Sequence, residues 1–329
     1  MKVIWIFLIL FNVLPIKSYP YHFYKNKNNL TTRDNVGNVS DGNNTCKNPT
    51  IRTSWENLKD FEKKSYINSL VCLMKLPSQM NYPGAKSRYD DLVYVHQKQS
   101  DYLNGNDVWH VTGQFLAVHR IYCYIFELML RYDCNYGGRL PYWNEMKDAG
   151  DFRNSKFLRA FGGAGNDKGE VIEGPLANIQ LNLGPGLQNL PRKLRRQLNE
   201  TASAMAGKQY YDKVMSQATF VEFLSAIRSY SHLAGHNGIG GELGEVQTAP
   251  VDGIFFSHHL YIDFLWASWQ EADPGSRIFD IRGIGYETEA EPAHETNYMT
   301  ALTFLGLAPD VPLYSALDTK GGFLCYRYE

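Results

Sequence analysis

The chain of 329 residues is 44% hydrophobic and 20% charged, and its 33 Lys and Arg are balanced by 34 Asp and Glu. This composition excludes a disordered chain, a collagen and a coiled coil, because apolar side chains sufficient for a large core occur without a fibrous repeat. The formal net charge of -1 argues against a nucleic-acid-binding protein, which needs surplus cations to neutralise phosphates.

The first 18 residues predict a secretory signal peptide. Lys2 precedes an apolar run from Val3 to Leu14, and small or polar residues follow. An uncleaved membrane anchor is the less favoured alternative, because a span needs about 20 apolar residues. We therefore expect removal of residues 1–18 and a secreted, extracellular protein without a membrane partner.

Residues 19–45 form a polar segment rich in Asn. It contains three Asn-x-Ser/Thr glycan acceptors, at Asn29, Asn38 and Asn43, and a fourth lies far downstream at Asn199. A motif this short also arises by chance, but three acceptors in one short segment favour real use. We expect a glycosylated N-terminal segment with little to bury.

Five cysteines follow the predicted signal peptide. Disulfides are allowed in a secreted protein, and an odd number leaves at least one thiol free or paired elsewhere. Cys123 lies within a strongly apolar helical stretch, so we expect it to be the free and buried one. The pairing of the others stays open: Cys46, Cys72, Cys134 and Cys325.

Helical patterns dominate from residue 46 onward, and strand signals are short and few. Apolar residues recur three and four apart in several segments, and Ser54 is predicted to cap the first of them. The basic run at 191–198 is predicted to be a solvated helix face rather than an anion site. The main helical segments are 54–76, 115–132, 218–236 and 258–272.

Seven of the nine histidines fall into two groups, and their spacing can be tested against helix geometry. His232 and His236 are four residues apart, which places them on one helix face, where two imidazoles can share a metal. For an isolated pair of this kind, an ordinary surface or core position is the more frequent explanation. The spacing of His232 and His236 therefore supports a metal site only together with the other histidines.

His110 and His119 would lie on opposite faces of one continuous helix. They can share a metal only if the helix begins between them, and the apolar run starts at Phe115. His110 would then reach in from a loop and His119 from the helix. His96 lies upstream in another helix-like stretch.

His258 and His259 are adjacent, so at most one of them is expected to face a given metal. Asp263 lies one helical turn after His259, and we expect it to hold a histidine by a hydrogen bond. Neutral imidazole suits copper, zinc, iron and nickel, and neither His-Glu-x-x-His nor a two-histidine, one-carboxylate triad is present. Two all-histidine sets of three therefore predict two copper ions facing each other.

These residues closely resemble the type-3 dicopper proteins, namely tyrosinases, catechol oxidases and haemocyanins. The start of the domain, CKNPTIRTSWENLKDFEKKSYINSLVCLMKLPS, is similar to that of the short secreted polyphenol oxidases of fungi. The motifs that carry the resemblance are WHVTGQFLAVHR at 109–120, LPYWNE at 140–145, SHLAGHNGIGG at 231–241 and IFFSHHLYIDFLWASWQ at 254–270.

The resemblance implies a mainly α fold, an antiparallel four-helix bundle with long loops and few short strands, in one dicopper domain at 46–329. Each copper would be held by one helix pair. His258 would be a neighbour of the ligands, and Arg120 and Asp263 would be supporting polar residues. The implied ligands are His96, His110 and His119 for one copper and His232, His236 and His259 for the other.

The sequence departs from the family pattern at several positions. Leu233 stands where many tyrosinases have an Asn thought to help deprotonate a monophenol, and Glu222 only approximates the position of the acid paired with it. Leu233 and Asn237 each follow a predicted ligand and are our candidates for a substrate gate. The short stretch after His259 leads us to expect no separate C-terminal domain over the site.

The resemblance implies oxidation of o-diphenols to o-quinones with reduction of O2 to water, with little hydroxylation of monophenols. One alternative is a full tyrosinase or an oxidase that tailors a phenolic secondary metabolite. Another is a non-catalytic O2-binding copper protein. The natural phenol and the oligomeric state stay open.

Overall fold

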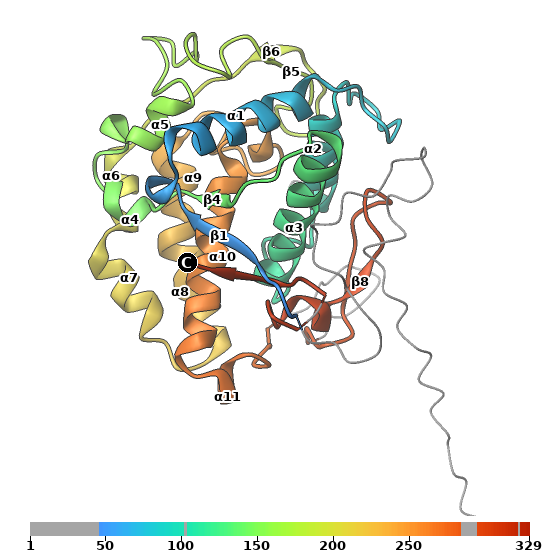
Figure 1. Ribbon diagram of the computed structural model, residues 1–329, viewed down its shortest axis with the longest axis vertical. Helices are drawn as coiled ribbons and strands as arrows, with labels where there is room; N and C mark the ends of the chain where they lie inside the picture. The colour runs from blue at the N-terminus through green and yellow to red at the C-terminus, as the bar shows by residue number, and fades with distance from the viewer. Residues whose placement is uncertain (1–45, 102–103, 284–294, 322) are drawn as a thin grey trace, which may run out of the picture.

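The computed structural model describes residues 46–101, 104–283, 295–321 and 323–329. The predicted signal peptide, the Asn-rich segment and the acceptors within it lie outside these residues. The described chain is mainly helical, and its longest helices pack side by side in a bundle with long loops and short strands around it (Figure 1). The predicted fold class is confirmed.

The bundle consists of two long helices, one shorter helix and a composite helical run. α3 and α10 pack against each other along the centre, and most of their residues are buried. This burial explains why their sequences are apolar on almost every face. The bundle elements are α2 (Arg88–Gln99), α3 (Phe115–Asp133), α10 (Phe255–Ala272) and the run α8 (Phe220–Ile227), η6 (Arg228–His232) and α9 (Leu233–Ile239).

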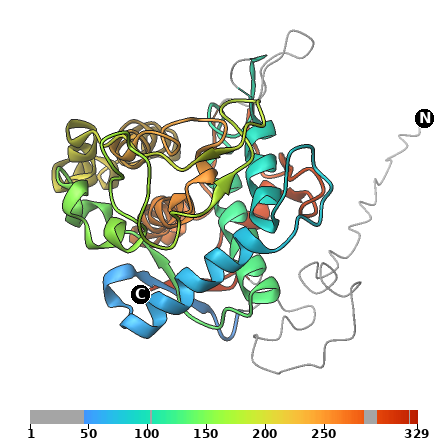
Figure 2. The ribbon, with the colours of Figure 1, turned by 90° about the horizontal axis from the view of Figure 1, so that it is seen from above.

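Shorter elements surround this bundle. α1 (Asp60–Lys75) crosses α2 and α3, as the two perpendicular views show (Figure 2). The remaining α-helices are α4 (Glu145–Asp148), α5 (Lys156–Ala160), α6 (Glu200–Ser203), α7 (Lys208–Met215) and α11 (Pro274–Arg277). The 3-10 helices are η2 (Trp55–Asn57), η4 (Phe152–Asn154), η5 (Ala204–Ala206), η7 (Ala249–Val251) and η8 (Leu313–Ala316).

The predicted cap at Ser54 is wrong. Residues Thr50–Ser54 form strand β1, the side chain of Ser54 bonds Glu56, and α1 begins only at Asp60. A serine followed by an acidic turn is a local signal, and here pairing with distant strands overrides it. By contrast, α2 starts with a complete capping box, in which Ser87 and Asp90 bond each other's backbone N–H groups.

A three-stranded parallel sheet joins the two ends of the described chain. β1 lies between β4 (Leu140–Tyr142) and β9 (Tyr326–Tyr328), and the order is β4-β1-β9. In Figure 1, β1 and the last strand, drawn in dark red, pass across α10, and the hydroxyl of Tyr328 in β9 donates to the backbone O of Leu260 in α10 at 3.0 Å. Six two-residue strands in three antiparallel pairs complete the β structure of the described residues: β2 (Ser100–Asp101) with β3 (Asn106–Asp107), β5 (Gln180–Leu181) with β6 (Arg192–Lys193), and β7 (Ala301–Leu302) with β8 (Val311–Pro312).

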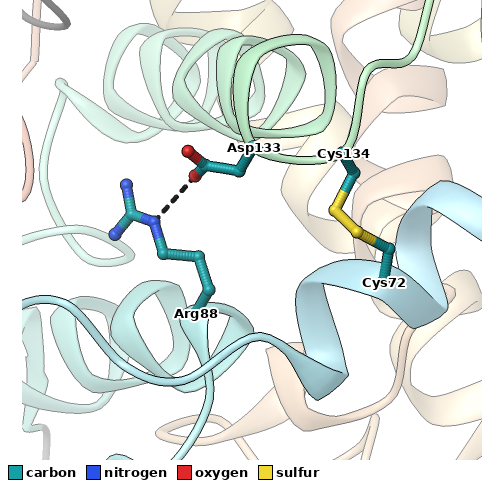
Figure 3. Close-up of a disulfide and its surroundings, with 4 residues drawn as sticks. All are labelled: Cys72, Arg88, Asp133 and Cys134. Atoms are coloured by element: carbon teal, nitrogen blue, oxygen red, sulfur yellow. Dashed lines mark hydrogen bonds and ion pairs between the residues drawn. A yellow bond between two sulfur atoms is a disulfide. The ribbon is translucent and has the colours of Figure 1, made fainter. Parts of the chain in front are cut away.

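Two disulfides fasten this arrangement, and Cys123 is free and buried as predicted. Cys46–Cys325 ties the residues just before β1 to those just before β9. Cys72–Cys134 ties the end of α1 to the end of α3, where Arg88 of α2 also pairs with Asp133 at 2.8 Å (Figure 3). The ends of three helices are therefore fixed together.

The basic run at 191–198 is not a solvated helix face. It is extended, and β6 lies within it. Arg196 is fully buried, and its guanidinium makes two hydrogen bonds to Asp252, at 2.7 and 2.9 Å. The number of basic residues in the run does not reveal that Arg196 is buried, because the carboxylate that neutralises it, Asp252, is distant in the sequence. Within the described ranges, no helix has the length and apolarity needed to cross a membrane.

Candidate metal centre

The first histidine group brings together His96 of α2, His110 of the turn before α3, and His119 of α3. One ring nitrogen of each lies within 4.8 Å of the others. The prediction that the helix begins between His110 and His119 is confirmed, because α3 starts at Phe115. A loop residue and two helical residues therefore converge on one point.

The second group contains four histidines from three elements. His232 ends η6, His236 lies one turn further in α9, and His258 and His259 lie in α10. The Nε2 atoms of His236 and His259 are 3.2 Å apart. Two imidazoles that bind one ion tetrahedrally, with metal–nitrogen bonds of about 2.0 Å, have their nitrogens roughly 3.3 Å apart. This pair therefore has the spacing of two ligands of one metal.

The two groups face each other directly. The ring of His119 stacks on that of His259, with centroids 4.4 Å apart and planes within 12°. Phe115 and Phe255 begin α3 and α10, and each lies four residues before one of these histidines. The two central helices thus present the same Phe-x-x-x-His arrangement from opposite sides.

Hydrogen bonds fix the orientation of most of the rings. The Nδ1 atom of His96 bonds the backbone O of Gln247 at 3.0 Å, and that of His119 bonds the O of Phe115 at 2.8 Å. The Nδ1 of His236 bonds the O of a residue seven positions later at 2.7 Å. A carbonyl accepts only, so these Nδ1 atoms carry the hydrogen and each Nε2 keeps its lone pair.

Several buried ring nitrogens have no hydrogen-bond partner, which is costly unless a ligand binds them. The Nε2 atoms of three predicted ligands, His96, His119 and His232, are in this position, and so are the Nε2 atom of His258, which is not a predicted ligand, and the Nδ1 atom of His259. Burial lowers the pKa of His96, His119, His232, His236 and His259 well below the usual value, and neighbouring imidazoles lower it further. Neutral rings with free lone pairs fit a metal pair.

Sequence reasoning missed two carboxylates. The Nδ1 of His110 donates to Asp107 Oδ1 at 3.0 Å, and the backbone N–H of His110 donates to the same oxygen. Glu145 bonds the Nδ1 of His258. The three-residue spacing before His110 could have indicated Asp107. No local signal indicates Glu145, which lies 113 positions away from its histidine.

The ring of His258 packs against the backbone of α9 at Gly235. A side-chain carbon at Gly235 would lie 2.2 Å from the Nδ1 of His258, so only glycine fits there. Burial lowers the pKa of His258 to about 3, and burial together with Asp148 raises that of its partner Glu145. His258 is therefore a neutral ring held from behind by a carboxyl group.

The prediction that Asp263 holds a histidine is wrong. Its carboxylate instead accepts hydrogen bonds from Arg120 at 2.5 Å, Arg52 at 3.0 Å and the hydroxyls of Tyr326 and Tyr328 at 2.5 and 2.6 Å. A position one turn after a histidine shares its face but is more distant from the metal along the axis. Asp263 and Arg120 therefore support the helices rather than a ring.

A pocket of about 690 Å³ leads to the histidines. His110, His232 and His236 line it, and so do the gate candidates Leu233 and Asn237. Both candidates are exposed, Leu233 by 40%. Glu222 does not line this pocket, because its side chain caps α8 by bonding the N–H and hydroxyl of Thr219.

The predicted helix at 218–236 contains a π-helical turn at η6, which ends at His232. π turns arise from one extra residue in an α-helix and occur mostly at functional sites. The extra residue shifts the angular position of His232 relative to α8. The periodicity of apolar residues did not reveal this π turn, because the apolar residues before and after it each fit the spacing of an ordinary α-helix.

The common central domain of tyrosinase matches residues 86–272, a stretch that spans both histidine groups. The chain belongs to the tyrosinase family. Tyrosinase ustQ of Aspergillus flavus is 30% identical over 86% of this chain and 80% of its own length. The N-acetyl-6-hydroxytryptophan oxidase ivoB of Emericella nidulans is 28% identical over 86% of this chain and 93% of its own.

Solved structures agree with the tyrosinase fold. A polyphenol oxidase variant from Thermothelomyces thermophila has a TM-score of 0.75 and 26% identity, with 85% of this chain and 89% of that chain covered. Tyrosinase from Burkholderia thailandensis matches with a TM-score of 0.60 at 16% identity. Tyrosinases bind two copper ions, and this chain is an oxidoreductase of the polyphenol oxidase type that acts on phenols.

Proposed function

We propose that this tyrosinase-family protein is a secreted catechol oxidase. Two catechols are oxidised to two o-quinones while one O2 is reduced to two molecules of water. The observation that carries the proposal is the pair of facing histidine groups at the base of a pocket. Copper ions held by these two histidine groups would supply the redox chemistry between the phenol and O2.

We infer which residues hold the metals. Each ligand offers a ring nitrogen to a common point, and the 3.2 Å between His236 and His259 favours His259 over His258. His258 is turned toward Glu145 and fills the space over Gly235. The proposed ligands are His96, His110 and His119 for one ion and His232, His236 and His259 for the other.

The chain's own residues then orient the substrate. A catechol that enters the pocket passes Leu233 and Asn237 and reaches His232 and His236. Leu233 offers neither a proton acceptor nor a hydrogen bond to a water, so a monophenol is not deprotonated there. We therefore expect catechol oxidation with weak hydroxylation of monophenols.

The test is an assay of the copper-loaded protein on 4-methylcatechol and on p-cresol. We expect rapid oxidation of the catechol, slow or no conversion of the monophenol, and about two coppers per chain. Leu233→Asn should raise the monophenol rate relative to the catechol rate, and Leu233→Val is the matched control. Lag-free hydroxylation of p-cresol by the unaltered protein would refute the role of Leu233.

One alternative is an oxidase dedicated to a particular phenolic metabolite, as the name of the Emericella nidulans relative suggests for that protein. Another is a carrier that binds O2 without oxidising phenols. The pocket favours an enzyme, because a carrier needs its histidines shielded from phenols. O2-dependent colour without catechol turnover would support the carrier.

We further propose that residues 1–18 are removed, that 19–45 is a glycosylated segment and that 46–329 is the catalytic domain. The two disulfides support an oxidising compartment. Asn199 is exposed, and its Oδ1 caps α6 by accepting from Ala202 N–H. Mass spectrometry of the secreted protein, before and after glycosidase treatment, checks the N-terminus and each acceptor.

A further inference from the structure

Arg228 is a cation in the wall of the substrate pocket that forms no ion pair with any described residue. Its side chain is partly buried. Among the residues that the structure describes, it makes no hydrogen bond or ion pair, whereas the buried Arg52, Arg120 and Arg196 each bind a carboxylate. Burial lowers the pKa of Arg228, and Asp107 is the acid that counteracts this. A desolvated guanidinium without a partner is costly unless an anion binds it.

Asp107 does not satisfy this cation. Its Oδ1 already accepts from the ring and the backbone of His110. Among the described residues that line the pocket, Asp107 and Arg228 are the charged ones, and the others are apolar or neutral. The exposed apolar residues of the wall are Val111, Val221, Leu233 and Val246.

Arg228 is also close to the metal centre. It begins the π turn that ends at His232, and a π turn of about 4.4 residues places the two on nearly the same side. The ring of Phe115 lies 5.8 Å from the guanidinium carbon and 4.7 Å from the His232 ring. One aromatic ring therefore separates the cation from a proposed ligand.

We propose that Arg228 binds a carboxylate on the substrate, so that the preferred substrate is a catechol with an anionic side chain. This inference rests on the proposed catechol oxidase activity. The apolar wall contacts the aromatic part, and the guanidinium donates two parallel hydrogen bonds to the carboxylate oxygens. Arg228 is a specificity residue and takes no part in electron transfer.

The experiment compares kcat/KM for 3-(3,4-dihydroxyphenyl)propionate with that for neutral 4-methylcatechol. We expect Arg228→Met to lower the ratio of the two at least about tenfold, as the loss of a charge-assisted hydrogen bond implies. Arg228→Lys should keep part of the preference. Arg153→Met removes an exposed arginine outside the pocket, and its ratio should equal that of the unaltered protein.

Calorimetry supplies a readout without turnover. The copper-loaded protein should bind 3-phenylpropionate more tightly than 3-phenylpropanamide, and Arg228→Met should abolish the difference. Equal ratios and equal binding in the Met variant overturn the role of Arg228. If the unaltered protein oxidises neither catechol, the proposed function fails, while the calorimetry still decides whether Arg228 binds carboxylates.

Discussion

Hydrogen bonds to the imidazoles decide which ring nitrogen is free for a metal. Backbone carbonyls perform this task for His96, His119 and His236, so no side-chain substitution removes those contacts directly. His110 depends instead on the carboxylate of Asp107. The loop histidine is therefore the proposed ligand whose orientation is most sensitive to a single substitution.

Asp107→Leu removes both hydrogen bonds to His110. We expect copper affinity at the first group to fall roughly 10- to 100-fold, as for other lost partners of metal-binding histidines. Asp107→Asn keeps an acceptor oxygen and should lose less. Competition titrations with a copper chelator measure the effect, and Asp167→Leu, in an exposed loop, is the control. Unchanged affinity in Asp107→Leu would contradict the assigned role.

Asp263 makes the stability of the protein sensitive to acid. Burial alone raises its pKa, but the charges of Arg120 and Arg52 and the hydrogen bonds from two tyrosines lower it below the ordinary value. A carboxyl group with a lowered pKa stabilises the folded state above its unfolded pKa of about 4, and this contribution is lost as the pH falls through the folded pKa.

We therefore expect the free energy of unfolding to fall steeply below about pH 4. Urea unfolding of the metal-free protein at several pH values measures this dependence. In Asp263→Asn the protein should be less stable at neutral pH, and its stability should change less between pH 4 and pH 2. The same slope in both proteins would show that Asp263 is not responsible.

Among individual residues, the six proposed ligands were predicted from the sequence, because helical spacing and family motifs both indicate them. The sequence predicted neither Asp107 nor Arg228. The spacing of Asp107 before His110 could have indicated the first. The significance of Arg228 depends on what surrounds it in space, because a charge on a helix has no local mark that distinguishes a pocket wall from a solvated face.

The composite helix of α8, η6 and α9 is the element on which the second metal group depends most. Its π turn sets the angle at which His232 meets the other rings. Deletion of Ser229, an exposed residue of this turn, should restore an α-helical count and rotate His232 by about 100°.

We expect this deletion to reduce bound copper from two ions to one per chain, with the helical circular dichroism retained. Metal analysis of the folded protein measures the loss. Deletion of Lys168 in an exposed loop is the control and should leave both coppers in place. Two coppers in the Ser229 deletion would show that the π turn is dispensable.

Elements with strong apolar periodicity could be predicted from the sequence. One of them is α3, including its start at Phe115. Elements stabilised by distant partners were not. β1 pairs with strands that lie far along the chain in both directions, and the basic run at 191–198 is extended because Arg196 binds Asp252. Local propensity carries no information about such contacts.

A disulfide and a pair of strands join the two ends of the described chain. Cys46–Cys325 joins residues 279 positions apart, next to the sheet in which β1 contacts β9. A loop this long restricts the unfolded chain strongly, so Cys46→Ser together with Cys325→Ser should cost roughly 2–5 kcal/mol of stability. Thermal unfolding under non-reducing conditions measures it.

The matched comparison is Cys72→Ser together with Cys134→Ser, which opens the shorter loop of 62 positions. In the chain-entropy description this pair contributes less. A larger loss from opening the shorter loop would show that the packing of α1 on α3, rather than loop length, dominates.

The hydroxyls of Tyr326 and Tyr328 complete the set of donors to Asp263, one helical turn from His259. Removal of either hydroxyl would leave the buried carboxylate of α10 with fewer donors. Strand β9 and the helix that contains His258 and His259 are therefore coupled through one buried charge.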